Sequence, residues 1–158
     1  MSGQPGIVVG VEGTAAGRAA LEWAFREGLM RRRPVTVVHA CGQPLGREVR
    51  AMTAVEGRRA SACMLDAAIA EASRAVGGRP EVIEHSLHGP AARVLIEQAQ
   101  GADMLVVGRG HHLGVVDVIG QSVPAECVRH ATCPVVVIPG AAGGAAVDEA
   151  YVAEASPA

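Results

Sequence analysis

Lysine is absent from this chain of 158 residues, so all 14 basic residues are arginines. Schiff-base chemistry and the P-loop that binds nucleotide phosphates both need a lysine amine, and both are therefore excluded. Aromatic residues are almost as scarce, because one Trp, one Tyr and one Phe make up only 2% of the chain. The sequence offers no aromatic surface on which single-stranded nucleic acid could stack.

Excess positive charge and long apolar runs are also missing. The net charge is -2 at pH 7, which argues against binding nucleic acid through its phosphates. No stretch has the unbroken apolar length of a transmembrane helix, and the N-terminus lacks the charged region of a signal peptide. We therefore expect a cytoplasmic protein that contacts neither nucleic acid nor membrane. No zinc or disulfide spacing joins the four cysteines, which are Cys41, Cys63, Cys127 and Cys133.

Short apolar runs alternate with helical patterns along most of the chain. Strands are predicted at 6–11, 35–40, 82–87, 103–107 and 134–138, and helices at 15–30, 49–76, 91–100 and 123–130. The spacing of apolar residues predicts the inward faces of the two long helices, at Ala19, Ala20, Trp23, Ala24 and Leu29 of the first and at Met52, Val55, Ala60, Cys63, Met64, Ala67, Ile69 and Ala70 of the second. Strands separated by helices predict an α/β, Rossmann-like fold, a parallel sheet with helices on both faces. The domain spans 1–140, and the small and acidic residues of 141–158 predict a flexible tail.

Ligands of such sheets collect at the carboxyl ends of the strands. Glu12, His39, His88 and the glycines after the fourth strand all follow strand ends, so we expect them on one rim. Between that fourth strand and a helix opened near Ser122 lies a glycine-bearing loop. Bare backbone N–H groups and a helix N-terminus suit phosphate.

Four segments together resemble the universal stress protein family, namely GIVVGVEGTAAGRAALEWA, VTVVHA, GPAARVLIEQAQGADMLVVG and SVPAECVRHATCPVVV. The resemblance runs from Gly6 to Pro139. It implies a five-stranded parallel sheet in the order 3-2-1-4-5, and a homodimer joined through the Cys133–Pro139 strand. It also implies that ATP binds in some members, with slow or no hydrolysis.

Nucleotide-binding members of that family show Gly-x-x-Gly-x9-Gly-Ser/Thr after strand four. Counting from Gly108 places the side chains of His111 and Gln121 at the second and third glycine positions. Counting from Gly110 puts a glycine correctly at Gly120, but Gln121 then separates it from the serine that follows. A side chain where backbone must approach phosphate costs space and φ freedom.

The resemblance implies a nucleotide site with an acidic residue after strand one, here Glu12, on the nucleoside. Arg109 would pair with phosphate, and Val38 and His39 would lie beside the adenine. ATP with Mg²⁺ is the expected ligand, and no catalytic residue is assigned. The predicted binding residues are Val11, Glu12, Val38, Gly108, Arg109, Gly110, His111, Gly120, Gln121, Ser122 and Val123.

Structural interpretations compete with these roles. Ser122 also suits the cap of helix 123–130, and Glu12 also suits the N-terminal dipole of the first helix. Two further alternatives are zinc binding by His88, His111 and His112 and a redox role for Cys133. Three functions stay open: a dimeric regulatory module that binds an adenine nucleotide, a dimer that acts through protein contacts without nucleotide, and a slow ATPase.

The fifth strand is apolar on both sides. An exposed edge of that composition invites aggregation unless it is covered, and pairing with a symmetry mate covers it. By contrast, the polar alternation at 82–87 predicts the other sheet edge.

Overall fold

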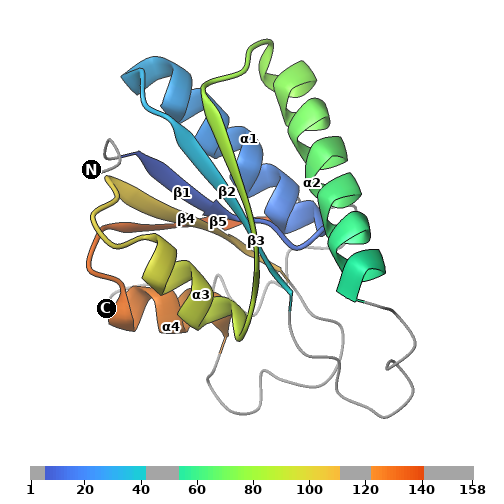
Figure 1. Cartoon of the computed structure of the whole chain (residues 1–158). Helices are drawn as coiled ribbons and strands as arrows, with labels where there is room; N and C mark the ends of the chain where they lie inside the picture. The colour runs from blue at the N-terminus through green and yellow to red at the C-terminus, as the bar shows by residue number, and fades with distance from the viewer. Residues whose placement is uncertain (1–5, 42–53, 111–121, 141–158) are drawn as a thin grey trace, which may run out of the picture.

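The computed structural model of this protein describes residues 6–41, 54–110 and 122–140. In these ranges five strands alternate with four helices (Figure 1). The elements are β1 (Ile7–Gly10), α1 (Ala15–Arg31), β2 (Val35–Cys41), α2 (Ala54–Val76), β3 (Val82–His88), α3 (Ala91–Gln98), β4 (Met104–Arg109), α4 (Val123–His130) and β5 (Val135–Pro139).

All five strands form one parallel sheet in the order β3-β2-β1-β4-β5. The predicted α/β class and strand order are confirmed. β1 lies at the centre, where Val9 pairs with Val37 on one side and Val106 on the other. Every residue of β1 is buried, whereas β3 contains only half-buried and exposed residues, as an edge strand does. The division at residue 140 stays a prediction, because residues 141–158 lie outside the described part.

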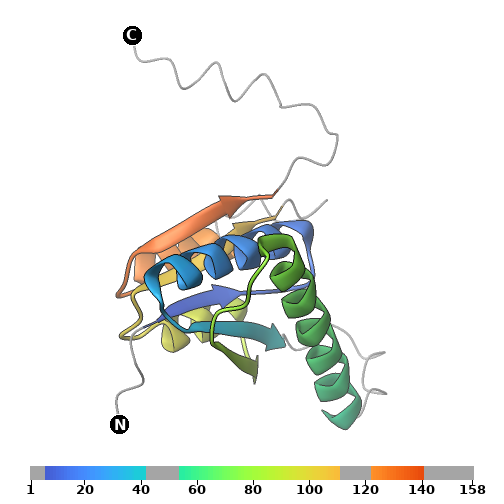
Figure 2. The same ribbon diagram turned by 90° about the horizontal axis from the view of Figure 1, so that it is seen from above.

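Helices cover both faces of the sheet. α1 and α2 lie on one face, and α3 and α4 lie on the other (Figures 1 and 2). Successive strand residues point to opposite faces, so Ile7 and Val9 join the core under α1 and α2, while Val8 joins the core under α3. Each strand thus helps to build two separate hydrophobic cores.

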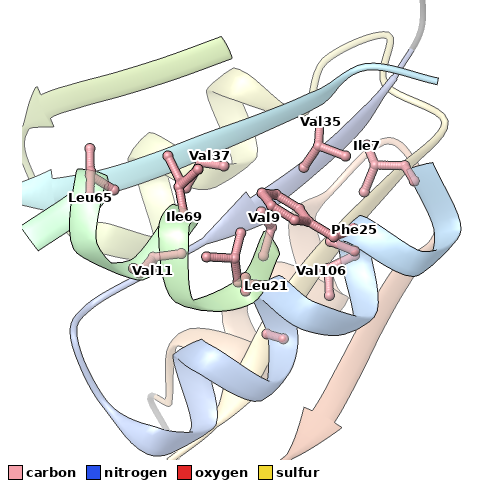
Figure 3. Packing of buried hydrophobic residues seen from close by; sticks show 14 of the residues in the cluster. Ile7, Val9, Val11, Leu21, Phe25, Val35, Val37, Leu65, Ile69 and Val106 are labelled. Carbon is pink, nitrogen blue, oxygen red and sulfur yellow. The ribbon is translucent and has the colours of Figure 1, made fainter. Parts of the chain in front are cut away.

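The larger core is filled by aliphatic side chains around the single phenylalanine. Phe25 and Leu21 of α1 are fully buried and pack beside Ile69 of α2, over Val9 and Val106 (Figure 3). Burying a side chain of this size stabilises the fold by roughly 1.5–3 kcal/mol. A core with one aromatic ring therefore depends on many branched aliphatic contacts.

The predicted inward faces of the two long helices were partly wrong. On α1 Trp23 packs against the larger core as expected, although it is only half-buried, but Leu29, also expected inward, is 40% exposed. On α2 the pattern favoured Ala60, Cys63, Ala67 and Ala70, all of which are exposed. Ile69, which the pattern also favoured, is buried, but Ser61, Leu65, Ala68 and Ala72 are buried with it in place of those four residues. Alanines occur all round α2, so hydrophobicity alone gave little contrast between its faces.

Candidate functional site

The carboxyl ends of the strands and the N-termini of the helices that follow them make one rim of the molecule. Parallel pairing places Gly10 of β1 beside Val38 of β2, and Val9 beside Val106 of β4. Each connecting helix runs back along the sheet, so α1 and α4 begin at this rim. We call it the carboxyl rim, and it is the place where ligands of such sheets bind.

Glu12 stands on the carboxyl rim directly after β1. The following Gly13 has φ +80°, a conformation that favours glycine, so the chain turns sharply into α1. The Thr14 hydroxyl donates to Oε1 of Glu12 at 2.5 Å, and Thr14 Oγ1 accepts the N–H of Gly17 at 3.1 Å. Thr14 therefore caps α1 and holds the exposed Glu12 carboxylate at the helix N-terminus.

Val11, directly before Glu12, and Val38 of β2 are both buried. As whole residues they are only 2% and 1% exposed, respectively, and the N–H of Val11 donates to the Val38 carbonyl at 2.9 Å. Neither residue therefore presents appreciable surface at the carboxyl rim. Their burial in the core is a sufficient reason for valine at both positions.

The sequence suggested that Gly108 and Arg109 lie in a loop, but the structure places them in a strand. They are the last residues of β4 and pair with Ile138 and Pro139 of β5. A β-carbon built at Gly108 would lie 2.4 Å from the Ala16 carbonyl oxygen, closer than real contacts allow. The close approach of β4 to the first turn of α1 thus requires glycine here. Gly110 follows the strand, and a β-carbon there would meet only ordinary contacts.

Ser122 caps α4, as one of its two interpretations predicted. Its Oγ accepts the N–H of Ala125 at 3.3 Å, and its carbonyl accepts the N–H of Glu126 at 3.0 Å. Val123 packs against the core under α3 and α4. The remaining predicted site residues, His111, Gly120 and Gln121, lie outside the described residues, as does His112.

A polar cluster at the carboxyl ends of β2 and β3 was not foreseen. In this cluster, His39 Nδ1 lies 2.6 Å from Ser61 Oγ. Ser61 Oγ in turn lies 2.6 Å from Ser86 Oγ. The Cys41 sulfur is 3.4 Å from both His39 Nδ1 and Ser86 Oγ. Strand alternation places His39 and Cys41 on the face of Val37, a signal present in the sequence. Ser61 was missed because the inward face of α2 was misassigned.

Burial lowers the pKa of His39 below its ordinary value of 6.5, and the nearby Glu12 carboxylate opposes that shift. A neutral imidazole is therefore favoured near pH 7. Burial raises the pKa of Cys133, and it raises that of Cys127 to about 11, with the Glu126 carboxylate adding to the shift. Both of these thiols stay protonated near neutral pH.

Among the described residues, no three His, Cys, Asp or Glu side chains gather as metal ligands. No helix in the described ranges has both the length and the apolar character needed to cross a bilayer.

These features define an open α/β protein, with a parallel sheet covered on both faces and its candidate ligand site at the carboxyl rim. The model of the universal stress protein family matches residues 6–139. The chain belongs to the universal stress protein family, which confirms the resemblance seen in its motifs.

Curated relatives are similar to this chain over about half of their own length. A universal stress protein of Mycobacterium tuberculosis is 34% identical over 152 residues, which covers 84% of this chain and 47% of that protein. Another, from Mycobacterium bovis, is 29% identical over 145 residues, covering 85% of this chain and 48% of the relative.

Solved structures of similar fold include proteins crystallised with nucleotides. A universal stress protein in complex with cAMP has a TM-score of 0.69 at 20% identity, covering 89% of this chain and 100% of its own. The protein from Archaeoglobus fulgidus in complex with dAMP has a TM-score of 0.60 at 25% identity, covering 85% and 97%. One from Arabidopsis thaliana with AMP bound has a TM-score of 0.59 at 19% identity, covering 92% and 99%.

Proposed function

We propose that this protein is a regulatory module of the stress response that binds an adenine nucleotide at its carboxyl rim. Glu12 accepts hydrogen bonds from the ribose hydroxyls, and the main chain near Val38 lies along the adenine. The N-terminus of α4, at Ser122 and Val123, faces the phosphates. Relatives of the same fold carry cAMP, dAMP or AMP, which supports this ligand class.

The observation that carries the proposal is the position of Glu12. Its carboxylate is exposed, follows the central strand and is fixed by the Thr14 hydroxyl. A carboxylate held in one place accepts a hydrogen bond from a sugar hydroxyl, as an acidic residue does for ribose in other α/β nucleotide sites. Glu12 would thus bind a nucleotide that keeps at least one free sugar hydroxyl, as AMP, cAMP and dAMP all do.

The phosphate end depends on helix geometry rather than on lysine. The first N–H groups of α4 have no partners within the helix. The Ser122 side chain accepts the N–H of Ala125 and leaves the other groups of this turn to bind a ligand. Together with the helix dipole, they favour an anion. Among the described residues no three His, Cys, Asp or Glu side chains gather as metal ligands, so Mg²⁺ would enter bound to the phosphates of the nucleotide.

Isothermal titration calorimetry of the purified chain with ATP, ADP, AMP and cAMP tests the proposal. We expect at least one of these to bind, and we expect Glu12→Gln to weaken binding about ten-fold, the value of a charged hydrogen bond. The control is Glu97→Gln, which removes the same charge from the exposed surface of α3. Absence of binding by every adenine nucleotide would reject the proposal. Phosphate release measured on the same samples tests the slow ATPase.

A second function, a dimer without nucleotide, is favoured by the packing of Gly108. The close approach of Ala16 is enough to require glycine at this position, and Gly108 pairs with Ile138 of β5. Neither feature requires a bound phosphate. In this alternative the protein acts through its contacts with other proteins.

Both functions include a homodimer through β5, the strand at the edge of the sheet. β5 pairs with β4 on one side, and its Val137 is 36% exposed. Val136 and Ile138 pack on one core and Val135 on the other, so the strand is apolar on both faces. An isologous pairing of two β5 strands would remove an edge of this kind.

A further inference from the structure

The cluster of Cys41, His39, Ser61 and Ser86 combines a thiol, an imidazole and two hydroxyls within hydrogen-bond distance. Three elements bring it together, because β2 supplies His39 and Cys41, β3 supplies Ser86, and α2 supplies Ser61. Ser61 is 4% exposed and is the buried polar residue of the described core, whereas Cys41 is half-buried and Ser86 exposed. The cluster therefore reaches from the interior to solvent.

One arrangement of donors and acceptors gives every hydroxyl and thiol hydrogen of this cluster an acceptor. The Ser61 hydroxyl donates to His39 Nδ1, the Ser86 hydroxyl to Ser61 Oγ, and the Cys41 thiol to Ser86 Oγ. This arrangement leaves the imidazole neutral, with Nδ1 as the final acceptor. The Cys41 proton has two paths to that nitrogen, one direct at 3.4 Å and one through the two serines.

We propose that Cys41 is a site of thiol–disulfide exchange, at which a small disulfide forms a mixed disulfide with the protein. His39 accepts the thiol proton. The Cys41 sulfur then attacks one sulfur of the disulfide, a new S–S bond forms, and the original S–S bond breaks. The departing thiolate takes the proton back from His39, so that one disulfide is exchanged for another with no net oxidation.

The other cysteines of this chain do not share that setting. Cys127 is fully buried, and burial keeps both Cys127 and Cys133 in the thiol form. Cys63 lies exposed on the surface of α2. It is therefore a natural internal reference, a thiol open to the same reagent but outside the cluster. The proposal goes beyond nucleotide binding and does not depend on it.

The test uses the full chain and hydroxyethyl disulfide, a small neutral reagent that approaches a half-buried sulfur. Peptide mass spectrometry follows the mixed disulfide at each cysteine over time. In the folded protein we expect Cys41 to react about ten-fold faster than Cys63, because a nearby base contributes at least this factor. In concentrated urea the two rates should become equal, since unfolding disperses the cluster and the His39 imidazole is no longer held against the Cys41 sulfur.

A matched variant tests the role of the imidazole. His39→Gln keeps a polar side chain but removes the base, and we expect it to slow the reaction of Cys41 about ten-fold while leaving Cys63 unchanged. Circular dichroism establishes that the variant is folded. A folded His39→Gln protein with an unaltered Cys41 rate would overturn the proposal. In the wild type alone, either a Cys41 rate no greater than that of Cys63 or a ratio unchanged by urea would also overturn it.

Discussion

Gly108, at the end of β4, touches the main chain of Ala16, in the first turn of α1. A β-carbon at Gly108 would lie 2.4 Å from the Ala16 carbonyl oxygen and 2.9 Å from the Gly17 nitrogen. Backbone atoms in a capped helix turn cannot move aside as a flexible side chain can. The contact fixes the N-terminus of α1, and with it Glu12, against the end of β4.

Gly108→Ala should therefore destabilise the protein even without any ligand. Overpacking of this kind costs about 2 to 3 kcal/mol, because the strand and the helix turn must separate. Urea unfolding followed by circular dichroism measures the loss. Gly110→Ala is the matched control, since a β-carbon there lies 3.9 Å from the Ala16 β-carbon, and we expect a change below about 0.5 kcal/mol. Equal stability of both variants would contradict the close packing.

Removing the cap of α1 should destabilise the fold and free the Glu12 carboxylate. Thr14→Ala deletes both the acceptor for Gly17 and the donor to Glu12, and should cost about 1 kcal/mol. Thr14→Ser keeps a hydroxyl and should retain most of the stability. Thr132→Ala, at an exposed position before β5, serves as the control in the same unfolding assay. A Thr14→Ala protein as stable as the wild type would show that this cap contributes nothing.

Acid should weaken the fold partly through His39. Its pKa is lowered in the folded protein by burial, so the unfolded chain binds a proton more readily. The free energy of unfolding therefore falls as the pH drops from the unfolded value of 6.5 through the lowered folded value, and it gains nothing from His39 above that window. Urea unfolding at pH values on either side of the window should show a larger loss for the wild type than for His39→Gln. Equal losses would mean that His39 is not responsible.

Charge at the free edge of β5 should prevent dimerisation. Val137→Arg places a guanidinium on the strand proposed to pair with its symmetry mate, and we expect the dimer to weaken at least about ten-fold. Analytical ultracentrifugation measures the dissociation constant. Met30→Arg, at a residue of α1 that is 72% exposed, is the control and should leave the dimer intact. A wild-type chain that sediments as a monomer would reject the dimer, and an unaffected Val137→Arg dimer would place the interface elsewhere.

Several parts of the fold could be predicted because they depend on local pattern. The apolar runs of β1 and β5, the polar alternation of β3 and the cap at Ser122 are all encoded within a few neighbouring residues. The inward face of α2 was not predictable in this way. Its many alanines suit either face, and only packing against α1 and the sheet decided that Leu65 turns inward.

The candidate site shows the same division. Glu12 was found because an acidic residue after the first strand is a feature of sequence order alone. The role of Gly108 was not, because the residue that explains it, Ala16, is distant in the chain and meets it only through the sheet.

The α/β class, the order of elements and the residues that follow each strand can be read from the amino-acid sequence, since they depend on periodicity and on turn residues. What those residues touch is established by the packed fold. It gave Gly108 a packing role and joined Ser61 of α2 to His39 of β2, because contacts between distant segments arise from how helices pack on the sheet.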